Sequence, residues 1–313
     1  MPAEVLSSRS SVTGIAYCWS VPGGLPAEGP APAAVFFLNG IGLDQDGFRE
    51  VLQAPELERP RYLYRNCLHV ALTVPGFEDA PDRAPEAPLG MVEQGRRVAA
   101  FLGEFLAQHP ALDVILYGFS FGSDLAVEVL PWLGSEVPLS RVILTEMNVN
   151  AHSCFITSRL AASYAAAKRE GPGRNQEAHK GFVSLVVKAN TEGRISDSLM
   201  QDMAVYFRTI AKKDWAQLAR SAQEASQDPE ARVAQFLGLT AEHPRTQFDL
   251  VFSDPEDLRI FHRRVETWGG KLGQVRILDA TAHEHFHHMS RAGVLENLGG
   301  RQSPGGGLPG LFP

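Results

Sequence analysis

The sequence predicts an α/β fold, in which a doubly wound, mostly parallel sheet has helices on both faces and carries an inserted helical cap. Short apolar runs suited to buried strands alternate with segments of helical periodicity from residue 33 to residue 147. The alternation stops at about residue 151 and resumes at residue 248. The 313 residues are 44% hydrophobic and 21% charged, which suits a globular protein with a sizeable core.

Each strand in the first half is followed by a helix, and that order favours parallel pairing. An edge hairpin is predicted within residues 3–20. The strands that follow it are expected at 33–38, 67–74, 113–119 and 141–147, and the helices between them at 44–57, 91–108 and 123–130. Residues 91–108 give the clearest helical pattern, because apolar side chains recur there every three or four positions.

The middle of the chain has helical segments only, at 155–168, 175–189, 196–210, 213–225 and 229–237. After them we expect strands at 248–252 and 275–278 and helices at 258–268 and 291–298. We therefore predict a core of residues 1–150 and 245–298, a helical cap at 151–244, and a flexible Gly/Pro-rich tail at 299–313. The alternative is that the middle helices belong to the layers flanking the sheet.

The strongest chemical signal is Gly118-Phe119-Ser120-Phe121-Gly122, between an apolar run and a helical segment. In this strand–turn–helix setting the pattern predicts a sharp turn that presents the Ser120 hydroxyl at the carboxyl end of a strand. The two glycines leave room for a crowded backbone, and the N-terminus of the following helix favours developing negative charge. Ser120 is the predicted nucleophile.

A loop that could stabilise an oxyanion lies earlier in the sequence. Asn39-Gly40-Ile41-Gly42 follows the apolar run 33–38, and its glycines allow backbone N–H groups to face a cavity. We predict that the N–H groups of Ile41 and Phe121 form the oxyanion hole. A plain tight turn is the alternative interpretation of the Gly-x-Gly loop.

A serine nucleophile needs a base and an acid that orients the base. Asp254 is the preferred acid because it directly follows the strand predicted at 248–252. It could equally be the N-cap of the next helix, with Pro255 at the first helical position. Asp257 is the second candidate, and Glu146, at the end of an earlier strand, also remains open.

The base is expected among the four histidines between His283 and His288. A histidine after the last strand completes the chain order Ser, Asp, His. His283 and His287 stand four residues apart, but no carboxylate or cysteine completes a known zinc spacing around them. No metal site is therefore predicted.

These residues together resemble the α/β-hydrolase superfamily over about residues 33–298. His285-Phe286-His287-His288-Met289 looks like the Gly-His-Phe-x-His-apolar string of capped members, with Glu284 in place of the glycine. On that likeness His285 is preferred as the base, whereas the distance from the strand end favours His283. The family's oxyanion loop usually begins with His-Gly, and here Asn39 takes the first place.

The resemblance implies a serine hydrolase that cleaves a carboxylic ester or thioester through an acyl-enzyme, without a cofactor. Phe119, Phe121 and the apolar faces of the insertion suggest a small, carbon-rich acyl substrate, although both aromatics could be plain core. The same parts also serve lactonases, C–C bond hydrolases, acyltransferases and cyclases. The alternative outside enzymes is a binding protein with the same fold and an inactive triad.

Charge and composition exclude several other classes. The net charge of −7 gives no reason to expect a nucleic-acid partner. No apolar run is long enough to cross a membrane, and the N-terminus does not look like a signal peptide. The three cysteines are scattered, which suits a reducing cytoplasm.

Overall fold

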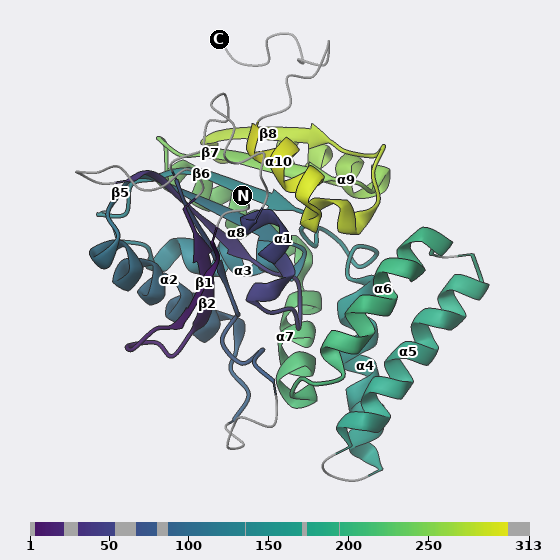
Figure 1. The fold of residues 1–313 in the computed structure, drawn as a ribbon. Helices are drawn as coiled ribbons and strands as arrows, with labels where there is room; N and C mark the ends of the chain where they lie inside the picture. The colour runs from purple at the N-terminus through teal and green to yellow at the C-terminus, as the bar shows by residue number, and fades with distance from the viewer. Residues whose placement is uncertain are drawn as a thin grey trace.

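The computed structural model describes residues 4–21, 31–53, 67–79, 87–134, 136–170, 174–193 and 195–299. Its centre is an eight-stranded sheet with the strand order β1-β2-β4-β3-β5-β6-β7-β8 (Figure 1). The first three strands in that order pair antiparallel, and all other neighbours are parallel. The strands are β1 (Leu6–Arg9), β2 (Ala16–Ser20), β3 (Ala31–Leu38), β4 (Leu68–Leu72), β5 (Ala111–Phe119), β6 (Leu139–Thr145), β7 (Gln247–Phe252) and β8 (Gln274–Asp279).

The central strands are buried on both faces, so they appear in the sequence as continuous apolar runs. Alternate residues of one strand enter different cores: Phe36 packs on one face of the sheet and Phe37 on the other. Helices cover both sides. The first core is closed by α2 (Met91–Gln108), α3 (Phe121–Val129), α8 (Pro229–Glu242) and α9 (Pro255–Glu266), and the second by α1 (Arg49–Leu52) and α10 (Arg291–Gly299).

The expected insertion is helical. It contains α4 (Phe155–Arg169), α5 (Asn175–Thr191), α6 (Asp197–Ile210) and α7 (Trp215–Gln227), which stand to one side of the sheet in Figure 1. The next helix, α8, instead packs on the sheet. The Phe236 ring lies 5.6 Å from that of Phe248 on β7 and 6.2 Å from that of Phe261 on α9. The division into a core and a cap at residues 151–244 stays a prediction. Because α8 packs on the sheet, a cap that ends before residue 229 is favoured.

The predicted fold class is confirmed, and the differences are local. The helix expected at 44–57 is a 3₁₀ turn (Gln45–Phe48) followed by α1, and residues 54–57 lie outside the described ranges, as does the tail from residue 300. The helix expected to begin at 258 begins at Pro255, because the Asp254 side chain caps it. Among the described helices, none is long and apolar enough to cross a membrane. All three cysteines are buried free thiols.

An ionic cluster joins the last three strands at the edge away from their carboxyl ends. The fully buried Asp249 accepts hydrogen bonds from Arg141 Nε at 2.6 Å and from Arg276 Nε at 2.7 Å. Arg141 also donates to the backbone oxygens of Asn297 and Leu298 at 3.0 and 2.8 Å. The cluster therefore ties α10 to β6, β7 and β8.

We expect Asp249→Asn to destabilise the fold by about 3 kcal/mol, because it leaves the mostly buried Arg141 guanidinium without its anion. Urea unfolding followed by circular dichroism measures this loss. Glu177→Gln, which removes one partner of an exposed Arg174–Glu177 pair, is the control and should leave the midpoint unchanged. Equal midpoints for both variants would contradict the importance of the cluster.

Candidate active site

Ser120 sits on the sharp turn that the sequence predicts. Its φ of 51° and ψ of −121° lie where a residue with a Cβ is strained, and it separates β5 from α3. The Ser120 N–H donates to Thr145 O on the neighbouring β6 at 2.8 Å, which fixes the turn against the sheet. Ser120 is partly exposed, whereas its neighbours on both sides are buried.

The flanking glycines are required by close backbone contacts. A Cβ on Gly122 would lie 2.1 Å from Leu38 O, and one on Gly118 would lie 2.7 Å from Gly122 O. The start of α3 therefore presses directly on the ends of β3 and β5. The G-x-S-x-G pattern in this chain reflects that packing.

Glu146 lies beside Ser120 at the same edge of the sheet. Phe119 and Thr145 are register partners on the parallel strands β5 and β6, so the residues that follow them come at the same level. Glu146 has a φ of 57°, the second strained non-glycine position among the described residues. Its Oε1 accepts a hydrogen bond from the Ser253 N–H at 2.8 Å. The carboxylate is thereby held between β6 and the end of β7.

His285 contacts this carboxylate. Its Nδ1 lies 3.3 Å from Glu146 Oε2, and its ring centroid lies 5.1 Å from that of Phe119, the residue before Ser120. With Nδ1 donating to Glu146, Nε2 is the nitrogen that can accept a proton. Within the described residues, no hydrogen bond joins Ser120 Oγ to His285, and apo sites often hold such pairs loosely.

A second histidine holds the other carboxylate oxygen. His288 is fully buried, and its Nε2 lies 3.2 Å from Glu146 Oε1. Its Nδ1 faces Asn297 Nδ2 at 3.1 Å, so Nδ1 accepts and Nε2 carries the ring proton. Tyr117 fixes the arrangement by donating to His288 O at 2.7 Å and accepting from Asn297 at 2.9 Å.

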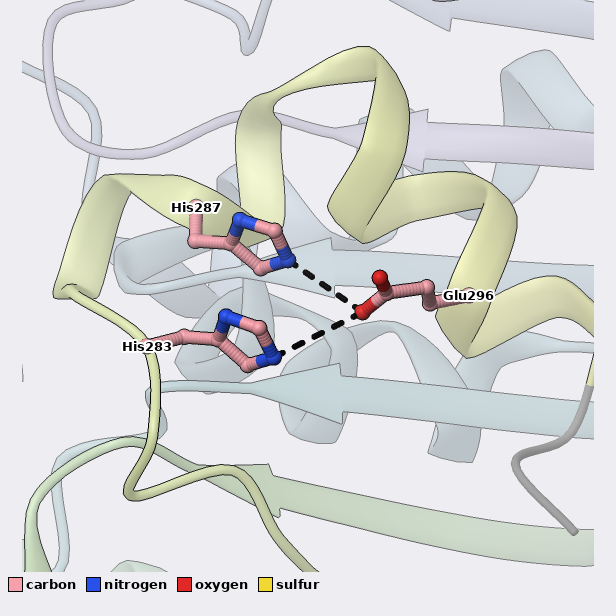
Figure 2. A group of neighbouring side chains, drawn as sticks. All are labelled: His283, His287 and Glu296. Carbon is pink, nitrogen blue, oxygen red and sulfur yellow. Dashed lines mark hydrogen bonds and ion pairs between the residues drawn. The ribbon is translucent and has the colours of Figure 1, made fainter.

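The local helix type explains why two histidines meet one acid. Residues His285–Met289 form the 3₁₀ helix η5, in which side chains three positions apart lie on one face. His285 and His288 have this spacing and both reach Glu146. His283 and His287 instead lie beside Glu296 of α10 (Figure 2).

Burial raises the pKa of the Glu146 carboxyl, but hydrogen bonds from His285 and His288 outweigh burial and lower this pKa to about 2. Glu146 is therefore an anion throughout the physiological range. A buried anion with a partly exposed imidazole beside it can orient that imidazole and stabilise its protonated form.

The predicted acid Asp254 does not contact His285 in the structure. Asp254 Oδ1 accepts from the N–H groups of Glu256 and Asp257 at 2.7 and 3.2 Å, and Oδ2 lies 3.4 Å from His152 Nε2. The N-cap interpretation of Asp254 is the one that the structure shows. Helix capping occupies the Asp254 carboxylate, and the carboxylate that contacts His285 is that of Glu146.

Asp257, the second candidate, accepts a hydrogen bond from Asn150 Nδ2 at 2.8 Å. Burial, followed by the charge of Asp254, raises the pKa of Asp257 to about 7. A carboxyl that is about half protonated at neutral pH is poorly suited to stabilise an imidazolium ion.

The predicted oxyanion loop adjoins the nucleophile turn. Leu38 pairs with Gly118, so Asn39 to Gly42 leaves the sheet next to Ser120. Phe121 is the first residue of α3, where an N–H group has no partner within the helix. Ile41 is buried in the loop beside it. The role of the Ile41 and Phe121 amides as an oxyanion hole stays a prediction.

A cleft of about 250 Å³ opens beside Glu146 and His285. Glu146 and His285 line it together with apolar side chains of the insertion, namely Phe155, Ile156, Ile195 and Leu199. Phe119 and Phe121 are fully buried, and Phe121 packs against Phe77 with 5.4 Å between ring centroids. Those two aromatics are core residues.

Two residues of this region had no predicted role. His288 was one of four clustered histidines, and only its 3₁₀ spacing from His285 could have indicated a shared partner. Glu296 lies on α10, and its proximity to His283 and His287 depends on how that helix packs. Gly293 allows that packing, since a Cβ there would lie 2.1 Å from His287 O.

Comparison with known proteins identifies the architecture. The sequence matches no protein-family model and no curated protein sequence. Many solved structures are similar. MenH from S. aureus has a TM-score of 0.57 at 13% identity, covering 90% of this chain and 97% of that one. A thermostable carboxyl esterase from Bacillus coagulans has a TM-score of 0.56 at 14% identity, covering 96% and 99%.

A third similar structure is 1H-3-hydroxy-4-oxoquinoline 2,4-dioxygenase, with a TM-score of 0.58 at 16% identity, covering 93% of this chain and 97% of that chain. These proteins carry different activities on one architecture, so the likeness identifies the fold and not the reaction. The resemblance seen in the sequence is confirmed at this level: the chain has the α/β-hydrolase fold.

Proposed function

We propose that the protein is a serine hydrolase in which Ser120 is the nucleophile, His285 the base and Glu146 the orienting acid. The contact between His285 Nδ1 and Glu146 Oε2, next to the strained Ser120 turn, carries the proposal. Residues from three separate elements converge there at the carboxyl edge of the sheet, where open α/β sheets bind ligands.

In the proposed reaction, His285 Nε2 removes the Ser120 proton as Oγ attacks the acyl carbonyl carbon. The tetrahedral oxyanion accepts hydrogen bonds from the Ile41 and Phe121 amides. The carbonyl re-forms, the bond to the alcohol or thiol breaks, and His285 returns its proton to that leaving group. Water then attacks the acyl-enzyme with His285 again as base, which releases the acid and restores Ser120.

The proposed substrate is a small, carbon-rich carboxylic ester or thioester. Ile156, Ile195 and Leu199 give the cleft beside His285 an apolar wall that would hold an acyl chain. An esterase is among the proteins with this fold, so the fold is compatible with this reaction. Esters without a negatively charged acyl group suit a cleft that already contains the anion Glu146, because like charges repel.

The first prediction concerns the nucleophile. Ser120→Ala should abolish labelling by a fluorophosphonate probe and lower kcat on nitrophenyl esters or acyl thioesters on the order of 10⁴–10⁶-fold. Ser123→Ala is a matched control, since the Ser123 hydroxyl is buried and donates to Thr145 O. Equal labelling and equal rates in wild type and Ser120→Ala would refute the proposed hydrolase activity. The alternative of a catalytically inactive binding protein with the same fold would then be favoured.

The second prediction separates the acids. Glu146→Gln keeps the shape of the side chain but removes the charge, so kcat should fall on the order of 10³–10⁴-fold. Asp254→Ala should cost about 1 kcal/mol of stability through the lost cap, with kcat within a few-fold of wild type. Asp257→Asn should also keep kcat. If Asp254→Ala were inactive and Glu146→Gln active, Asp254 and not Glu146 would be the acid that orients His285.

The same assays distinguish the two candidate bases. His285→Ala should lose activity to the same extent as Ser120→Ala, because these residues act as a unit. His283→Ala should retain most of it, since His283 lies beside Glu296 and not Glu146. Full activity in His285→Ala would contradict the assignment of the base.

The third prediction concerns acid stability. The pKa of Glu146 is lower in the folded chain, about 2, than its ordinary value of 4.5, so the folded state holds fewer protons between these values. The stabilisation is complete above pH 4.5 and is lost as the pH falls through 2, by on the order of 3 kcal/mol. Urea unfolding from pH 6 to pH 3 should therefore show a steeper loss for wild type than for Glu146→Gln. Parallel curves would contradict the lowered pKa.

A further inference from the structure

We propose a binding site for a divalent transition-metal ion, with zinc as the type ion, formed by His283, His287 and Glu296. This inference does not rest on the proposed hydrolase activity, because none of the three side chains belongs to the Ser120–His285–Glu146 set. Figure 2 shows both imidazoles directed at the same carboxylate. The ligand atoms of the three residues all lie within 4.8 Å of one another.

The separations fit a tetrahedral ion. His287 Nε2 lies 3.3 Å from Glu296 Oε2, and His283 Nε2 lies 3.7 Å from the same oxygen. Zinc binds nitrogen and oxygen at about 2.0–2.2 Å, which places neighbouring corners of the tetrahedron about 3.3–3.6 Å apart. The two nitrogen–oxygen separations are close to this spacing, the two imidazole nitrogens lie within 4.8 Å of each other, and a fourth corner is left for water.

The side chains can adjust to an ion. The His283 and His287 rings are stacked, with centroids 3.9 Å apart and planes 3° from parallel. The rings would have to tilt well away from parallel for both Nε2 lone pairs to meet at one ion. Such rotations are allowed, because the side chains of His283, His287 and Glu296 are 28%, 21% and 42% exposed.

The backbone supports the same arrangement. Gly293 lets α10 approach η5 closely, and Glu296 follows it by three positions, on the same face of α10. His283 and His287 are brought together by the turn and 3₁₀ helix that follow β8. Two imidazoles and one carboxylate form a donor set that suits zinc and similar ions.

The position of the site gives it a consequence for the proposed base. His285 lies between the two histidine ligands in the chain, so a bound ion would fasten the His285 segment to α10. His285 is not part of the cluster of ligand atoms, and its Nδ1 faces Glu146 instead. The proposed ion therefore has a structural role: it positions the His285 segment and does not touch the reacting atoms.

Calorimetric titration of the chelator-treated full chain with ZnCl₂ tests the proposal. Wild type should bind one Zn²⁺, and the dissociation constant should rise by at least about tenfold in Glu296→Gln and about a hundredfold in His287→Ala. Glu266→Gln and His262→Ala, which change the same residue types on or next to α9, are matched controls and should bind like wild type. Burial raises the pKa of Cys18, Cys67 and Cys154 to about 12, 11 and 12, so the thiols should not compete.

Further measurements distinguish loss of the metal site from misfolding of the variant. Circular dichroism and melting without metal should be the same for wild type and Glu296→Gln, whose side chain is partly exposed. Zn²⁺ should raise the melting midpoint of wild type and not that of Glu296→Gln. Co²⁺ should give the visible absorption bands of a tetrahedral site in wild type only. Absence of Zn²⁺ binding, or equal affinity in wild type, Glu296→Gln and His287→Ala, would overturn the proposal.

Discussion

The buried carboxylate of Glu146 is the constraint on which the candidate site depends. A buried anion is costly unless several donors satisfy it, and here the donors come from separate parts of the chain. Ser253 contributes its N–H from the end of β7, and His285 and His288 contribute imidazoles from η5. Because these donors together offset the burial of one charge, Glu146 also fixes His285 and the end of the neighbouring strand.

The strained backbone at this edge of the sheet is part of the same constraint. Ser120 and Glu146 are the two non-glycine residues with positive φ among those described, and they follow register partners on adjacent strands. Strain of this kind persists only where surrounding contacts determine it. The hydrogen bonds of Ser120 N to Thr145 O and of Glu146 N to Val251 O supply those contacts. The strained backbone places the Ser120 and Glu146 side chains next to each other at the same edge of the sheet.

Periodicity and motif context were sufficient for the fold and for the sharp turn at Ser120, and insufficient for the carboxylate that lies beside His285. Fully apolar strands and the helix at 91–108 are local patterns, and Ser120 carries a local motif. The acid depends on which strand lies next to the nucleophile strand. Since β6 and β7 are adjacent, either strand end could serve one histidine, and Asp254 was preferred over Glu146. In the structure Asp254 caps α9, where two backbone N–H groups occupy its carboxylate, and Glu146 is the one that contacts His285.

The insertion is joined to the core just after the predicted oxyanion loop. The buried Lys213 Nζ binds Asp44 at 3.0 Å and Asp79 at 2.8 Å, on the segments that follow β3 and β4. Burial alone would lower the pKa of Lys213, but the two carboxylates outweigh burial and raise it, so this link persists until the pH is well above neutral. A Cβ on Gly42 would come within 2.9 Å of Ile210 and 3.0 Å of Leu218, so two insertion helices press on that loop. Movements of these helices would therefore act on the Ile41 amide directly, which couples the wall of the cleft to the group proposed to hold the oxyanion.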